Sequence, residues 1–167
     1  MKTNIAIISL VDKFSSKIAQ ELSSSLGMYY ASLDDIISYE ILNMDEIKEK
    51  CGEEYLDNLK MKVIKDVLEY ENTVISLPIS ICSKYDFKKS AFDKTLTIYL
   101  KISQEEFDKI RKKNYDGKVK SIAFSSRDKY LAETSDIIIP VSNFGQVQNV
   151  KKIKREVVEY FKKKGVL

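Results

Sequence analysis

Short apolar stretches alternate with amphipathic ones along this chain, and the alternation limits the folds that the chain can adopt. The first apolar run is Ile5-Ala6-Ile7-Ile8. It is followed by Ile18, Leu22 and Leu26, which recur at helical spacing. Strands that alternate with helices are typical of a parallel sheet with helices on both faces. The sequence therefore predicts a three-layer α/β/α fold with a five-stranded parallel sheet.

Glycine, proline and acidic residues set the expected boundaries of these elements. Gly27 is a typical helix end, Pro78 ends a strand, and Asp34-Asp35 suit the start of a helix. We expect strands at 4–10, 28–33, 73–77, 95–102 and 136–141. We expect helices at 15–26, 53–71, 84–92, 103–113 and 147–163, one broken or two short helices at 34–51, a turn at 114–117, and a helix that ends near Thr134. No linker or repeat interrupts the series, which predicts one domain over residues 1–167.

The composition restricts the classes of function. No apolar run approaches the ~20 residues of a membrane span, and the first residues lead directly into a strand without a signal peptide. These features predict a cytoplasmic protein without a membrane partner. The chain has no histidine, and Cys51 and Cys82 lack metal-ligand spacing, so no metal site is predicted.

The positive charge of the chain is concentrated at its C-terminal end. Residues 151–167 carry seven Lys/Arg against Glu156 and Glu159, while the whole chain has a net charge of +3. A solvated helix face explains this run best. Nucleic acid or an acidic partner is the alternative, but no aromatic-rich strand of an RNA-binding module accompanies the basic segment.

Residues 9–16, Ser-Leu-Val-Asp-Lys-Phe-Ser-Ser, lie where a phosphate-binding loop would connect the first strand to the first helix. Such a loop reads G-x-x-x-x-G-K-[ST], because glycines let backbone N–H groups surround the phosphates and the lysine reaches the outer ones. Ser9 and Phe14 stand at the glycine positions, and Ser15 stands at the lysine position. Ser16 alone matches the pattern, as the hydroxyl that holds magnesium.

Several interpretations of these side chains stay open. Ser15 and Ser16 are candidates either to cap the helix or to bind an anion at its N-terminus. Lys13 and Lys17 are candidate replacements for the missing lysine. Asp34, with its neighbour Asp35, either opens a helix or serves a magnesium ion.

The layout resembles the shikimate kinases over about residues 4–161. The segment Cys51-Gly52-Glu53-Glu54 resembles the family's G-E-x-x-F-R, and Thr97-Ile98-Tyr99-Leu100 resembles its V-V-Y-L strand. Residues 127–136 resemble its R-x-P-L-Y-x-E-x-A-D without a gap. The resemblance implies a P-loop kinase-like fold with strand order 2-3-1-4-5, and ATP and Mg²⁺ as cofactors.

The same resemblance places several differences at the family's functional positions. The D-x-D acids fall on Ala31-Ser32-Leu33, a substrate arginine falls on Asp57, and a glycine triplet falls on Pro78-Ile79-Ser80. Arg127 matches the arginine that binds the substrate carboxylate in the family. Arg111 lies within one residue of an arginine that contacts the nucleotide.

Arg127 has two possible roles. It either points into the cleft and binds a small carboxylate, or forms an ion pair with Asp57 that closes the site. We favour the ion pair, because Asp57 makes an external anion unnecessary.

Three functions are consistent with these residues. The leading hypothesis is a degenerate shikimate kinase-like protein without efficient phosphoryl transfer, which binds a small anionic ligand, a nucleotide or a protein partner. The first alternative is an active ATP-dependent small-molecule kinase with a non-standard phosphate loop. The second is a nucleic-acid or assembly factor that uses the basic C-terminal helix.

Overall fold

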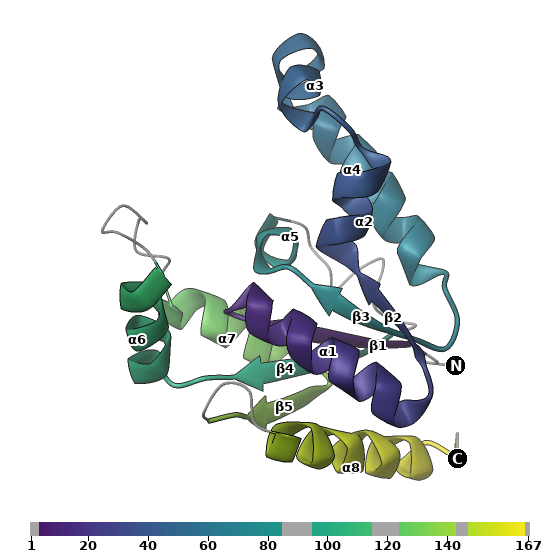
Figure 1. Cartoon of the computed structure of the whole chain (residues 1–167), viewed down its shortest axis with the longest axis vertical. Coiled ribbons are helices and arrows are strands. Elements are labelled where there is room, and N and C mark those ends of the chain that lie inside the picture. The colour runs from purple at the N-terminus through teal and green to yellow at the C-terminus, as the bar shows by residue number, and fades with distance from the viewer. Residues whose placement is uncertain (1–3, 85–94, 115–123, 143–146, 166–167) are drawn as a thin grey trace.

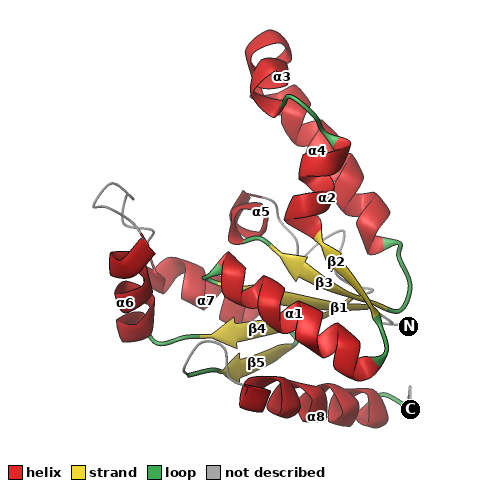
Figure 2. Cartoon of the chain, viewed as in Figure 1, coloured by secondary structure: helices red, strands yellow, loops and turns green. Residues whose placement is uncertain are grey.

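The fold is an α/β arrangement built around one parallel sheet (Figures 1 and 2). A computed structural model describes residues 4–84, 95–114, 124–142 and 147–165. The sheet consists of β1 (Asn4–Ser9), β2 (Tyr29–Ser32), β3 (Thr73–Leu77), β4 (Thr95–Lys101) and β5 (Ile137–Pro140). Its order is β2-β3-β1-β4-β5, as predicted, and every neighbouring pair is parallel.

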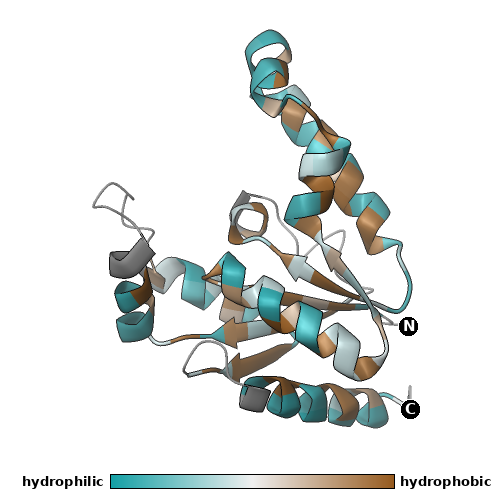
Figure 3. Cartoon of the chain, in the orientation of Figure 1, coloured by the Kyte–Doolittle hydropathy of each residue, from teal (hydrophilic) through white to brown (hydrophobic). Residues whose placement is uncertain are grey.

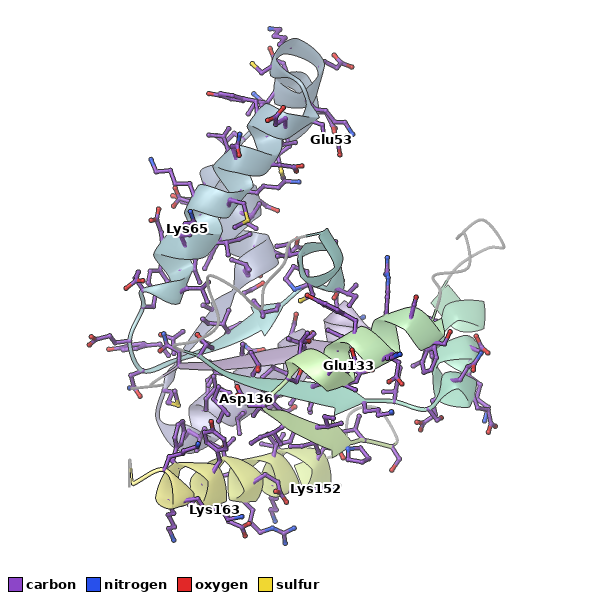
Figure 4. All side chains as sticks on the ribbon, turned by 180° about the vertical axis from the view of Figure 1, so that it is seen from behind. Glu53, Lys65, Glu133, Asp136, Lys152 and Lys163 are labelled. Atoms are coloured by element: carbon purple, nitrogen blue, oxygen red, sulfur yellow. The ribbon has the colours of Figure 1, made fainter. Side chains whose placement is uncertain are left out.

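Helices connect the strands and cover the sheet. They are α1 (Asp12–Leu26), α2 (Leu33–Glu40), α3 (Met44–Cys51), α4 (Glu53–Leu68), α5 (Ile79–Lys84), α6 (Gln104–Asn114), α7 (Phe124–Thr134) and α8 (Val147–Lys163). Helices α1 and α8 lie over one face of the sheet, and α7 lies on the other (Figures 1 and 4). Within the described residues, no helix combines the length and the apolarity needed to cross a membrane.

The three central strands form the middle of the core. All residues of β1 and β3 are buried, and so are residues 95–100 of β4. Most of the sheet has the brown of hydrophobic residues in Figure 3. Strands of a parallel sheet that is covered on both faces need apolar side chains on both sides, which explains the continuous apolar run of residues 5–8 in β1. Strand β5 is an edge strand, and its Ile138 is 43% exposed.

Most of the predicted boundaries agree with the structure to within two residues. The helix predicted at 53–71 is an exception, since it ends at Leu68, and α1 is another. Its predicted start at residue 15 is wrong, since the helix begins at Asp12. The prediction of one broken or two short helices at 34–51 is confirmed, because the two short helices α2 and α3 occupy this stretch. Helix α5, at Ile79–Lys84, was not expected. The predicted helix at 84–92 and the turn at 114–117 lie almost wholly outside the described residues.

Helices α2, α3 and α4 form an arm that projects from the sheet (Figure 1). Glu53 and Lys65, near the two ends of α4, show how far this helix extends (Figure 4). Gly52 joins α3 to α4 with a φ of 88°, a backbone conformation that glycine adopts easily and other residues rarely adopt. The contact between α2 and β3 brings the base of this arm to the sheet.

Helix α8 carries the basic C-terminal segment. Its buried residues Ile153 and Val157 belong to the core, while its lysines lie outside, as Lys152 and Lys163 show in Figure 4. Three of its basic side chains are engaged within the protein: Lys152 donates to the Pro140 carbonyl, Lys154 donates to the Ser25 carbonyl, and Arg155 pairs with Glu156. These contacts favour a packed and solvated helix face over a nucleic-acid surface.

Candidate functional site

A cavity of about 330 Å³ lies where β1, β2 and β3 end and their following helices begin. Open parallel sheets bind their ligands at the carboxyl ends of the strands, so this is the expected position for a site. The lining residues are Asp12, Lys13, Ser15, Ser16, Ser32, Asp34, Asp35, Ser76 and Pro78. Seven of these nine described residues are serines or aspartates.

The connection between β1 and α1 is short. Only Leu10 and Val11 separate the last residue of β1 from the first residue of α1. The N–H groups of Phe14 and Ser15 both donate to the Val11 carbonyl, at 3.0 and 3.2 Å. A phosphate-binding nest needs successive N–H groups that point at the ligand, and these two donors point into the helix instead.

Burial of Phe14 explains why the helix starts so early. The Phe14 side chain is 5% exposed and belongs to the core, and Ser15 is 1% exposed. The N-cap residue Val11 makes no side-chain hydrogen bond to the helix. The prediction that Ser15 or Ser16 caps the helix is therefore wrong, and the Ser15 hydroxyl donates within the helix to the Asp12 carbonyl at 2.9 Å. Packing rather than capping determines where α1 begins.

Asp12 connects the first strand–helix unit to the third. Its Oδ1 atom accepts a hydrogen bond from the N–H of Ile79, the first residue of α5, at 2.7 Å. The preceding residue, Pro78, has no N–H, so the Ile79 N–H is the first backbone donor after β3. The Asp12 carboxylate occupies this donor, although the two residues are 67 positions apart in the sequence.

The groups around Asp12 have opposite effects on its pKa. Asp12 is exposed as a whole residue, yet loss of hydration at its carboxyl group is the main cause that raises its pKa above the ordinary value. The Ile79 N–H lowers this pKa, Asp34 raises it by repulsion, and the Arg127 guanidinium lowers it by attraction. Arg127 therefore acts on this cavity even though it does not line it.

Replacing Asp12 with asparagine is expected to stabilise the fold at neutral pH. A carboxyl group whose pKa is raised on folding is harder to ionise in the folded state, so its contribution to stability falls as the pH rises above the unfolded value of 3.8. Asparagine keeps an acceptor for Ile79 and removes the charge. Urea denaturation should give the variant a higher free energy of unfolding than the wild type at pH 7, and this difference should shrink toward pH 4. Asp35→Asn, which leaves the Ile79 contact intact, is the matched control. A difference in the free energy of unfolding that is independent of pH contradicts the prediction.

The structure brings together four of the residues that the sequence singled out: Lys13, Ser15, Ser16 and Asp34 all line the cavity. Lys17 is exposed on α1 and is not part of the lining. Sequence analysis missed Ser32 and Ser76 as lining residues, and it missed the hydrogen bond between Asp12 and Ile79. Their types alone gave no signal, although each stands at or just beyond the carboxyl end of a strand.

The predicted contact between Arg127 and Asp57 is not tested by the contacts given for the described residues. Asp57 is half-buried on α4 and Arg127 is half-buried on α7. The attraction recorded for Arg127 is to Asp12. A pairing of Arg127 with Asp57 thus stays a prediction. Arg111 belongs to α6, but its side chain lies outside the described part of the structure.

A partly buried set of polar contacts positions the helix that carries Arg127. The Tyr99 hydroxyl donates to Asp128 Oδ1 at 2.8 Å, and Lys101 Nζ lies 3.1 Å from Asp128 Oδ2. Burial, together with the hydrogen bond to Asp128 and its negative charge, raises the pKa of Tyr99 far above its ordinary value. The hydroxyl therefore stays protonated and donates. These contacts attach the start of α7 to β4.

A second concavity, of about 610 Å³, lies at the ends of β4 and β5. Residues 101–103 and 140–142 form one side of it, and Glu105, Glu106 and Lys109 of α6 form the other. The nucleotide-side candidate Arg111 follows Lys109 on the same helix.

The cavity at β1–β3 fits a nucleotide phosphate chain poorly. Among the described residues that line it, Lys13 is the single cationic side chain, against the carboxylates of Asp12, Asp34 and Asp35. No group of three or more His, Cys, Asp or Glu side chains that could hold a metal ion occurs among the described residues. Carboxylates repel phosphate unless a cation lies between them.

Strand order and the position of the cavity define a P-loop kinase-like α/β protein. The family model for shikimate kinase matches residues 15–162. A shikimate kinase of Clostridium botulinum is 32% identical over 118 residues, which cover 68% of this chain and 67% of the relative. The chain belongs to the shikimate kinase family.

Solved structures agree on the fold. The shikimate kinase of Aquifex aeolicus has a TM-score of 0.65 at 24% identity, with 93% of this chain and 96% of that one covered. The shikimate kinase of Bacteroides thetaiotaomicron has a TM-score of 0.73 at 15% identity, with 96% and 98% covered. The predicted fold class and strand order are therefore confirmed.

Proposed function

We propose that this protein is a shikimate kinase family member that does not transfer phosphoryl groups efficiently and acts by binding at the cavity between β1, β2 and β3. The short connection between β1 and α1 is the observation that carries the proposal. It leaves residues 12–16 inside a helix, where the Phe14 and Ser15 N–H groups are already bonded to Val11. Phosphoryl transfer depends on positioned donors and cations around the phosphates, and this segment supplies few of them.

The charges of the cavity support the same proposal. Of the described residues that line it, three are aspartates, four are serines and one is a lysine. These groups favour a small hydroxylated ligand without a net negative charge over the anionic ligand or nucleotide predicted from the sequence. A protein partner remains the alternative to a small ligand.

An active kinase with a non-standard phosphate loop is the second candidate. It is favoured by the meeting of Lys13, Ser15, Ser16 and Asp34 at one cavity. In such an enzyme Lys13 replaces the missing lysine, Ser16 is the hydroxyl that the family pattern assigns to magnesium, and ATP is the phosphate donor. The second concavity beside α6 offers space for the rest of a nucleotide.

A coupled assay of ADP release with ATP, Mg²⁺ and shikimate separates the two candidates. Loss of a single transition-state donor costs about 10²–10³-fold in turnover, so we expect a rate at least ~100-fold below the enzyme median of ~10 s⁻¹. The Aquifex aeolicus shikimate kinase, run in parallel, is the positive control. Turnover near ~10 s⁻¹ that falls in Ser16→Ala would establish the active kinase instead.

A further inference from the structure

The geometry points to Asp12 as a built-in anion that determines the specificity of this cavity by excluding external carboxylates and phosphates. The inference rests on the proposed function, because it explains why a kinase-like cavity takes no phosphate chain. It assigns to Asp12 a role that neither the family match nor the sequence pattern supplies.

The first step of the argument is the hydrogen bond between Asp12 and Ile79. The 2.7 Å distance from the Ile79 N–H to Asp12 Oδ1 is typical of a charge-assisted bond. The N–H sits beside Pro78, which is part of the cavity wall. Any external anion that used this donor would first have to displace the Asp12 carboxylate.

The second step concerns the cations of the site. Arg127 acts on Asp12 by attraction, and Lys13, the cation of the lining, is the next residue along α1. A carboxylate that belongs to the chain is present at a high effective concentration, because it needs no association step. Asp12 therefore competes with a free anion for the Ile79 donor, and the Arg127 guanidinium attracts its charge from a distance.

The third step concerns the ionised state of the cavity. Asp34 repels Asp12, and Asp35 lies on the same lining. An incoming phosphate meets these charges in addition to Asp12. Among the three acids, only Asp12 combines the repulsion with a bond to the Ile79 N–H in the described residues.

Titration with inorganic phosphate, followed by calorimetry and NMR, tests the inference. Asp12→Ala should bind phosphate at least about tenfold more tightly than the wild type, since it frees a donor and removes a charge. Asp12→Asn should gain less, because asparagine still occupies the Ile79 N–H. It also serves as the second variant if Asp12→Ala does not fold. In that case, a higher phosphate affinity in Asp12→Asn than in the wild type supports the inference, and an unchanged phosphate affinity overturns it.

Two further variants distinguish Asp12 from a general charge effect. Asp35→Ala removes one carboxylate from the same cavity but frees no backbone donor, so it should gain clearly less phosphate affinity than Asp12→Ala. Asp12→Ala with Arg127→Ala should lose part of the gain in phosphate affinity, because the Arg127 guanidinium no longer attracts the phosphate. An equal gain in Asp35→Ala, or no gain in a folded Asp12→Ala, overturns the inference. These outcomes are independent of shikimate turnover. If the wild type is inactive and the Asp12→Ala variant gains no phosphate affinity, only the inference is contradicted. If the wild type is active, the proposed function is contradicted.

Discussion

Replacing Ile98 with alanine is expected to lower the free energy of unfolding by about 2–5 kcal/mol. Ile98 is 0% exposed and lies in β4, between Ile7 of β1 and Ile137 of β5 in the sheet register. Truncating the side chain leaves a cavity among groups that are held by both neighbouring strands and cannot collapse freely. Urea denaturation at equilibrium measures the loss. Since small domains have a total stability of about 5–15 kcal/mol, this is the largest single change that we expect.

The matched control is Ile138→Ala in the neighbouring strand. Ile138 is the same residue type in β5, one position from the partner of Ile98, but it is 43% exposed on the edge of the sheet. Its truncation loses mainly strand propensity, a range of ~1 kcal/mol across residue types. Equal losses at the two positions would contradict the burial of β4 between β1 and β5.

Replacing Tyr99 with phenylalanine is expected to cost about 1.5–3 kcal/mol, the range for a hydrogen bond to a charged group. The tyrosine is 0% exposed, and its hydroxyl donates to Asp128 Oδ1 at 2.8 Å. Phenylalanine leaves the ring packing unchanged and removes this donor, so Asp128 keeps only Lys101 of the two contacts described here. Urea denaturation measures the loss, and proteolysis within α7 reports whether the helix has loosened.

Tyr30→Phe provides the comparison for this change. The Tyr30 hydroxyl lies 3.3 Å from the Ser76 hydroxyl, a contact between neutral groups, and its loss is expected to cost about 0.5–1.5 kcal/mol. If the Tyr99 variant lost no more than the Tyr30 variant, the link between β4 and Asp128 would contribute little. The network would then not be what positions α7 and Arg127.

Phe14 shows how local sequence signals and tertiary packing can disagree. The serines at 15 and 16 are good helix caps, and they indicate a helix that starts at residue 15. In the structure the Phe14 side chain enters the core, and the residues around it are already helical at Asp12. Burial of an aromatic side chain is worth more than one cap, so the position of the core decided the start of the helix.

The composition of the candidate site was partly predictable for a simple reason. Lys13, Ser15, Ser16 and Asp34 follow the strands β1 and β2, and residues at the carboxyl ends of parallel strands meet at one edge of a sheet. Which of them face the cavity was not predictable. Lys17 lies one residue beyond Ser16, yet its position on α1 turns it to solvent, because successive helical residues point about 100° apart.

The sequence by itself determined the series of strands and helices. That information is local: the apolar runs of β1 and β3 and the helical spacing in α1 depend on side chains within a few residues of one another. Only the tertiary structure decided what Asp12 does. Its partner Ile79 is 67 residues away, and the two meet because β3 pairs with β1 and brings the start of α5 beside the start of α1. A side chain's partner across such a distance depends on the assembled sheet, and no local pattern encodes it.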